Sequence, residues 1–375
     1  MLLPTLSDRS RRWSIAVDRT QITELGEMPS VLDVAAAFAD PDAARTFLEA
    51  LVWPTGAFCP FCGSTHVWRF RADGRKSRPG LHECSDCCSQ FTVTTRTPLH
   101  STKLPLVKWI MAIYLITTSS KGIASTVLGR WIGVPQETAW KVGHAIRELM
   151  DLRDENGPAL SGVVEIDTKN VGGAPKYQRH VYHPPGRGTD KQPVLIAVER
   201  GGQVRASVVE GEARTDIEPV ITAAVEPTAH LMSDKDRAVG AVGKQFAAHD
   251  TIDHGAKEFA RSGGKGQPEI HSNTAESFGS QLERAQVGVF HQFGDHLLQR
   301  YVDEVAFRWN HTEREDYTDG LGRKRSRLVP GPFIQQAADL LRHAVGRQVR
   351  RSSTGGLRWP PPIAPGFRPA PSAGT

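Results

Sequence analysis

A few polar side chains stand where they could hold metal ions for phosphodiester chemistry. Asp167 ends the apolar run VVEID and Asp234 ends the run AHLMSD, so each carboxylate is expected at a strand end. The run HSNTAES opens a predicted helix and offers Asn273 and Glu276 one turn apart, and either could complete the site. Hard divalent cations favour carboxylate oxygens. Two such ions about 3.5–4 Å apart can activate an attacking oxygen and stabilise a leaving one.

The cysteines indicate a second kind of metal site. Cys59 and Cys62 form one C-x-x-C pair, Cys84 and Cys87 form another, and 21 residues separate the pairs. This spacing predicts a structural zinc ion held by four thiolates. A redox pair would need βαβ flanks and a haem site a following histidine, and neither pattern is present. Cys88 is expected to face away from the site, and the alternative is a small buried residue. Five aromatic residues are expected to supply the small surrounding core: Phe58, Phe61, Trp68, Phe70 and Phe91.

Basic residues favour a polyanionic partner, although a net charge of +5 does not identify one. Residues 122–149 resemble a helix-turn-helix, whose second helix carries Lys141 and Arg147 and would contact double-stranded DNA. The alternative is a plain helical linker. Lys176, Arg179 and Arg187 lie in a loop that follows Asp167 and could track a DNA backbone, or could simply be solvated.

The elements that must position these residues change type along the chain. Helical spacing predicts a helix at 41–52 and three or four short helices within 104–152. From 162 onward the order β-β-β-α-β-α-β-α predicts a mixed sheet of RNase H-like layout. After 313 the chain becomes basic and Gly-rich, and we expect one more helix near 332–345 and a disordered Pro-rich tail.

The fold class is therefore multidomain α/β, in five parts. The predicted domains are an N-terminal lead (1–54), a zinc ribbon (55–100), a helical region (101–158), a catalytic domain (159–315) and a C-terminal extension (316–375). Neither a membrane-length apolar run nor the apolar core of a secretory signal is present, which predicts a cytoplasmic, nucleoid-associated protein without a membrane partner.

Several motifs together resemble the zinc-ribbon insertion-sequence transposases of the ISXO-like group, whose catalytic domain is of the DDE type. The resemblance covers about residues 40–315, and its landmarks are CPFCGS, VVEIDTKNVGG, HSNTAESFGSQLERA and LQRYVDEVAFRWN. It implies that Asp167, before a Gly-Gly turn, is the first catalytic acid and Asp234 the second. The third is implied to be Glu276, with Asn273 as the alternative because subgroups of the family differ there.

Two positions depart from the family pattern. Family members usually carry a lysine that contacts transposon-end DNA where this chain has Glu283, so either Arg284 takes over the contact or the enzyme is impaired. A second acid usually follows the first, whereas Thr168 follows Asp167 here.

The resemblance implies a transposase that binds terminal inverted repeats and target DNA, acts as a homo-oligomer, and cleaves and joins DNA with two Mg²⁺ or Mn²⁺ ions. One alternative is an inactive or domesticated DNA-binding descendant, which the two departures favour. The other is a metal-dependent nuclease that cuts without joining, which the same acidic residues would support.

Overall fold

The computed structural model describes residues 29–70, 78–151, 159–172, 191–351 and 357–358. The chain divides into two compact units. The first, called here the helical unit, comprises Met1–Thr117, Leu128–Leu149 and Gly331–Thr375. The second, the sheet unit, comprises Thr118–Val127 and Met150–Pro330. None of the helices in the described part of the chain is both long and apolar enough to cross a membrane.

Short helices build most of the helical unit. They are α1 (Val31–Ala37), α2 (Pro41–Val52), α3 (Leu106–Thr118), α4 (Ser125–Ile132), α5 (Gln136–Leu149) and α10 (Phe333–Leu341). The predicted helix at 41–52 is α2, which begins where the Asp40 carboxylate accepts the amides of Asp42 and Ala43. The predicted break separates α4 from α5 because Gly133 adopts a positive φ of 62°.

The last helix of the chain packs against one of the first. Phe333 of α10 stacks on Phe47 of α2 at 6.4 Å between ring centroids, and it meets Tyr114 of α3 edge-on at 5.1 Å. Residues 333–341 therefore belong to the helical unit, whereas the sequence placed them in a separate extension. The prediction of a disordered tail concerns residues that mostly lie outside the described part of the chain.

The cysteine-rich segment folds as a small antiparallel sheet of β1 (Val67–Arg69), β2 (His82–Cys84) and β3 (Gln90–Phe91). Its core forms around Phe91, which is fully buried and meets Trp53 edge-on at 5.9 Å. Phe61 and Trp68 are 40% and 45% exposed. The prediction that they fill this core is wrong, because Trp53, from the end of α2, lies there instead.

A five-stranded mixed sheet forms the centre of the sheet unit, as predicted. Its strands are β4 (Val163–Val171), β5 (Gln192–Glu199), β6 (Val204–Val208), β7 (His230–Asp234) and β8 (Ala248–Ile252), in the order β6-β5-β4-β7-β8. The three strands β6, β5 and β4 pair antiparallel, while β4, β7 and β8 pair parallel.

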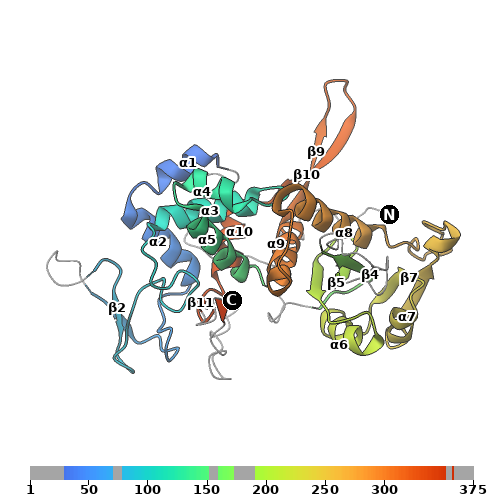
Figure 1. Cartoon of the computed structure of the whole chain (residues 1–375), viewed down its shortest axis with the longest axis horizontal. Coiled ribbons are helices and arrows are strands. Elements are labelled where there is room, and N and C mark those ends of the chain that lie inside the picture. The colour runs from blue at the N-terminus through green and yellow to red at the C-terminus, as the bar shows by residue number, and fades with distance from the viewer. Residues whose placement is uncertain (1–28, 71–77, 152–158, 173–190, 352–356, 359–375) are drawn as a thin grey trace, which may run out of the picture. The chain divides into compact units, whose positions relative to one another are not determined.

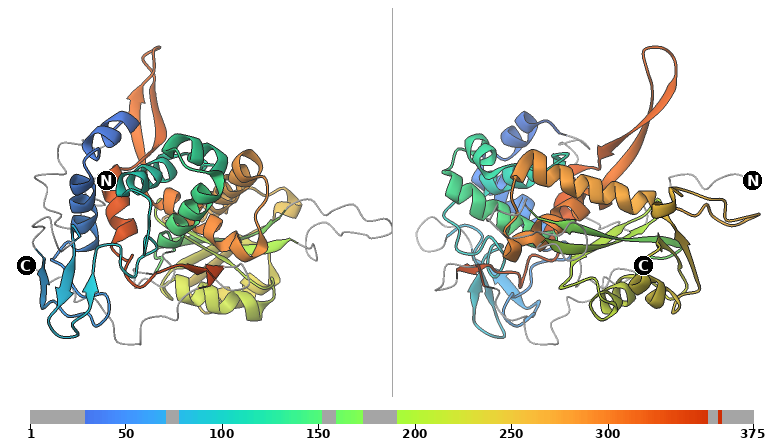
Figure 2. Two further views of the ribbon diagram at one scale, coloured as in Figure 1. Left: turned by 60° about the vertical axis from the view of Figure 1, so that its left-hand side comes forward. Right: turned by 45° about the vertical axis from the view of Figure 1, so that its right-hand side comes forward.

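Helices cover both faces of this sheet (Figures 1 and 2). The α6 (Arg214–Ala224) and α7 (Arg237–Gly243) helices lie on one face, and α8 (Asn273–Ala285) and α9 (Leu298–Asn310) lie on the other. Side chains alternate along β4: Val164 and Ile166 pack on the α6 face, whereas Val171 packs on the α8 face. Glu165, Asp167 and Lys169 therefore share the α8 face.

A hairpin that the sequence did not reveal follows α9. It consists of β9 (Thr312–Thr318) and β10 (Lys324–Pro330), paired antiparallel and almost wholly exposed. A short pair, β11 (Arg350–Arg351) and β12 (Leu357–Arg358), follows α10.

Candidate active site and zinc centre

Asp167 and Asp234 lie at matching positions on neighbouring parallel strands. The register of β4 with β7 pairs Val163 with His230 and ends at Ile166 opposite Ser233. The next residues in that register are the two aspartates, so their carboxylates leave the same edge of the sheet. Asp167 is half-buried and Asp234 is exposed. Asp234 ends β7, as predicted, whereas Asp167 lies in the middle of β4; the prediction that Asp167 ends a strand is wrong, because β4 continues to Val171 in its pairing with β5.

The surroundings of Asp167 favour its neutral form. Burial raises the pKa of this carboxyl group, and the negative charges of Glu276 and Asp234 raise it further, while the amide of Thr168 opposes the shift by donating to the carboxylate at 2.8 Å. A carboxylate in such a position is stabilised by a cation. Carboxylate oxygens such as these are the ligands that hard divalent ions favour.

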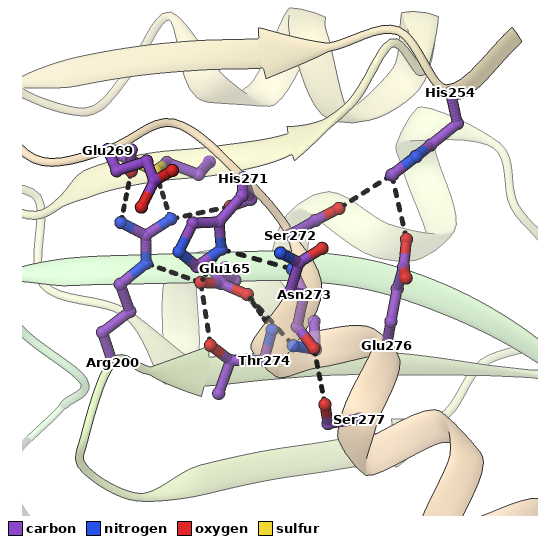
Figure 3. Close-up of polar contacts among 12 residues, drawn as sticks. Glu165, Arg200, His254, Glu269, His271, Ser272, Asn273, Thr274, Glu276 and Ser277 are labelled. Carbon is purple, nitrogen blue, oxygen red and sulfur yellow. Dashed lines mark hydrogen bonds and ion pairs between the residues drawn. The ribbon is translucent and has the colours of Figure 1, made fainter. Parts of the chain in front are cut away.

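Glu276 reaches this region from the first turns of α8. Its carboxylate is half-exposed and lies 2.9 Å from His254 Nε2, and His254 also lies 3.0 Å from the hydroxyl of Ser272 (Figure 3). Asn273 starts the same helix, is exposed, and uses its carbonyl to accept the hydroxyl of Ser277. The oxygens of the three acids are not gathered within 4.8 Å of one another, a spacing that only the cysteines reach among the described residues.

A buried glutamate that the sequence analysis did not single out lies two residues before Asp167. Glu165 is fully buried and accepts the Nε proton of Arg200 at 2.6 Å. It also accepts hydrogen bonds from Thr274 and Ala275 at the start of α8 (Figure 3). A buried charge needs partners such as these, and they come from segments far from Glu165 in sequence.

The four cysteine sulfurs form a compact cluster. Cys59 Sγ lies 3.6 Å from Cys87 Sγ, and Cys62 Sγ lies 3.6 Å from Cys84 Sγ. All four sulfurs lie within 4.8 Å of one another. Ligands about 2.3 Å from a tetrahedral zinc ion are separated by roughly 3.8 Å, so this arrangement fits zinc. Cys88 is exposed, with φ of 55°, and is not part of the cluster, in agreement with the expectation that it faces away; the alternative of a small buried residue is wrong.

Burial also shapes the chemistry of these thiols. It raises the pKa of Cys59 well above the usual thiol value, whereas hydrogen bonds from Ser89 lower the pKa of Cys87. A thiolate at Cys59 therefore needs a nearby cation, which a zinc ion would supply.

Comparison with known proteins identifies two domains in the chain. Residues 159–310 match the ISXO2-like transposase domain, and residues 39–90 match the transposase zinc-ribbon domain. The chain is also 26% identical, over 261 residues, to a protein of Halobacterium salinarum described as an uncharacterized protein in transposable element ISH50. That match covers 66% of this chain and 83% of the relative.

The chain contains an ISXO2-like transposase domain and a transposase zinc-ribbon domain. The zinc-ribbon match contains the cysteine cluster, and the transposase-domain match contains the three acids. Together the two matches identify the protein as an insertion-sequence transposase with a zinc ribbon.

In this transposase the unusual Glu283 has a partner. Lys169 Nζ lies 3.0 Å from Glu283 Oε2, and this pairing lowers the pKa of the glutamate. Glu283, one of the two departures from the family pattern, thus meets Lys169 across the β4–α8 interface, where the strand lysine neutralises the acid on the helix. Arg284 is exposed beside them, and its Nε donates to the carbonyl of Ser280 at 3.1 Å.

The other basic residues predicted to contact DNA differ in how exposed they are. Lys141 on α5 is exposed and pairs with Glu137 at 2.7 Å. Arg147 is only 4% exposed, which disagrees with a DNA contact, because the last two turns of α5 are buried on all sides. Lys176, Arg179 and Arg187 lie outside the described residues.

Proposed function

We propose that this transposase binds the terminal inverted repeats of its element and then cleaves and joins DNA, with Asp167, Asp234 and Glu276 holding two Mg²⁺ or Mn²⁺ ions. The observation that carries the proposal is the register of β4 with β7, which brings the two aspartates to one edge of the sheet. The raised pKa of Asp167 supports it, since repulsion among three acids is relieved by bound cations.

The bound ions would activate the attacking oxygen and stabilise the leaving one. The protein's own contribution is to hold carboxylates from two strands and one helix around the scissile phosphate. Glu276 is favoured over Asn273 as the third ligand because a carboxylate binds hard cations better than an amide. The charge of Glu276 also acts on Asp167.

DNA recognition is assigned to the zinc ribbon and the helices that follow it. Lys141 is exposed on α5, and Arg284 is exposed on α8 next to Glu283, so both can reach phosphates. Zinc would hold the ribbon in shape, because its small core contains few buried side chains. We further propose a homo-oligomer that pairs two element ends on target DNA.

The decisive experiment is cleavage and strand transfer on a duplex that carries the element's own ends. Wild type would be compared with Asp167→Asn, Asp234→Asn, Glu276→Gln and Asn273→Ala, with Glu218→Gln on α6 as a control on the other face of the sheet. The first three variants should bind the ends normally yet lose at least about 100-fold in cleavage, which corresponds to roughly 2.7 kcal/mol of the activation barrier.

The same assay separates the alternatives. Cleaved but never joined ends would indicate a nuclease. Binding without cleavage in either metal would indicate an inactive descendant, which Thr168 in place of an acid favours. Loss of activity in Asn273→Ala but not in Glu276→Gln would reverse the assignment of the third ligand.

A further inference from the structure

The helix that carries Glu276 begins without a cap of its own. The N-cap residue of α8 is Ser272, whose side chain makes no capping hydrogen bond and lies instead 3.0 Å from His254. The amides of the second and third helical residues usually bind the N-cap side chain. Here those residues are Thr274 and Ala275, and their amides must find an acceptor elsewhere.

Glu165 on β4 supplies that acceptor. Its Oε2 accepts the amides of Thr274 at 2.7 Å and Ala275 at 3.1 Å, while its Oε1 accepts the Thr274 hydroxyl at 3.0 Å. The glutamate lies 109 residues before Thr274 in the chain, so it ties two distant segments together. A negative charge at this end of the helix is also stabilised by the helix dipole.

Arg200, directly after β5, neutralises the buried charge and holds the segment that leads into α8. Its Nε donates to Glu165, and its Nη2 donates to the carbonyl of His271 at 2.8 Å. Its Nη1 also donates to the carbonyl of Glu269. The His271 ring adds a contact, with Nδ1 lying 3.2 Å from Glu165 Oε1. Both oxygens of Glu165 are therefore surrounded by partners, as a fully buried carboxylate requires.

This network lies next to proposed catalytic acids on both segments, β4 and α8. Glu165 and Asp167 are two residues apart on the same face of β4, and Glu276 directly follows Ala275, whose amide Glu165 accepts. We propose that Glu165 is a positioning residue, which fixes the first turn of α8 on β4 and thereby sets where Glu276 stands relative to Asp167. The inference rests on the proposed role of Glu276 as a metal ligand.

Glu165→Gln is the direct test. Because Arg200, the Thr274 amide and hydroxyl and the Ala275 amide all donate to Glu165, the amide NH₂ of glutamine would face donors and one half of the cap would be lost. The Mn²⁺ concentration for half-saturation of the full-length, zinc-loaded protein should rise about 10–100-fold, the range typical of residues that orient metal ligands. Amide hydrogen exchange at Thr274 and Ala275 should accelerate, while DNA affinity and zinc content should stay unchanged.

Two further variants keep the test informative if Glu165→Gln does not fold. Arg200→Lys keeps the charge but cannot bind Glu165 and both carbonyls together, so it should shift Mn²⁺ binding and amide exchange in the same direction by a smaller factor. Glu218→Gln removes an ion-paired glutamate from α6 on the opposite face and should change neither.

The proposal is overturned if folded Glu165→Gln retains, within twofold, both the Mn²⁺ affinity and the first-turn exchange rates of the wild type. Failure of the proposed function would appear differently, as a wild-type protein that neither binds Mn²⁺ nor cuts DNA. In that case amide exchange alone decides whether Glu165 fixes the start of α8.

Discussion

Asp167 carries a carboxylate in surroundings that favour its neutral form. Because its pKa in the folded protein lies above the unfolded value, the folded state keeps a proton that the unfolded state has already lost. The stability of the metal-free protein therefore falls as the pH rises from the unfolded pKa of Asp167 to its folded pKa, and it stays lower above the folded pKa. A bound divalent ion would reverse the penalty.

Asp167→Asn should consequently stabilise the metal-free protein at pH 7. The neutral side chain removes repulsion with Glu276 and Asp234, and a gain of about 1 kcal/mol would raise Tm by roughly 2–4 °C. Mn²⁺ should raise the Tm of the wild type but not of the variant. Thermal unfolding at several pH values, with and without Mn²⁺, checks both effects, and a lower Tm for Asp167→Asn at pH 7 would contradict the assignment.

Lys169 and Glu283 form a partly exposed pair, so the pair should contribute little to stability. Glu283→Lys adds one cation next to Arg284 and releases Lys169 from its ion pair. It should strengthen binding of element-end DNA by about three- to tenfold at low salt, with the gain shrinking as salt rises. Fluorescence anisotropy at two salt concentrations measures this. Glu218→Lys adds the same charge on α6, and an equal gain in DNA affinity there would show that the position of the added charge is irrelevant.

Sequence reasoning found Asp167 and Asp234 because each closes an apolar run, although Asp167 lies within β4 and only Asp234 ends its strand. It passed over Glu165, since an acid in the middle of VVEID is indistinguishable from a solvent-facing residue until its partners at Arg200 and Thr274 are known. These contacts join residues far apart in sequence, and no local pattern encodes them. The Lys169–Glu283 pair was missed for the same reason, as 114 positions separate its members.

Among the elements, the zinc ribbon is the one whose shape depends most on a metal. Its strands have only two or three residues each, and a sheet of this size has little core to stabilise it. Zinc binding in such a site contributes directly to folding.

Cys87→Ser should therefore abolish bound zinc, unfold the ribbon and eliminate DNA binding, while Mn²⁺-dependent stabilisation of the sheet unit persists. Metal analysis and a DNA-binding assay give the readout. Cys88→Ser is the matched control, because Cys88 lies next to Cys87 in sequence but outside the sulfur cluster. Loss of zinc from Cys88→Ser would mean that the ligand set is different.

Elements with a clear apolar period were predicted well, and those without one were not. The strands of the sheet and α2 have buried faces that repeat at the expected spacing. The hairpin of β9 and β10 has almost no apolar alternation, so only its Asp319-Gly320 turn signal was available. Helix α8 ends at Ala285, where the chain continues in a π-type turn over Gln286–Phe290.

On the scale of the whole molecule, the sheet unit is inserted into the helical unit. The helical unit is assembled from three stretches of sequence, and the C-terminal one contributes α10. Phe333, fully buried against Phe47 and Tyr114, joins that last stretch to the first.

Phe333→Ala should destabilise the helical unit by about 3–5 kcal/mol, because it leaves a large cavity between α2 and α10. Hydrogen exchange resolved by segment should show faster exchange in α2 and α10 with no change in β4. Phe259→Ala serves as the comparison, since Phe259 is largely exposed and its loss should cost less than about 0.5 kcal/mol. Equal acceleration in both units would show that they unfold as one.

The pairing of α2 with α10 also sets an order of events during synthesis. At about 5–20 residues per second, roughly 15–60 s pass between the emergence of Phe47 and that of Phe333, and the sheet unit is translated in the interval. A nascent chain that stops soon after Pro330 thus carries the whole sheet unit but lacks the last stretch of the helical unit. Truncated products should then compete poorly for the DNA ends that the finished protein is proposed to bind.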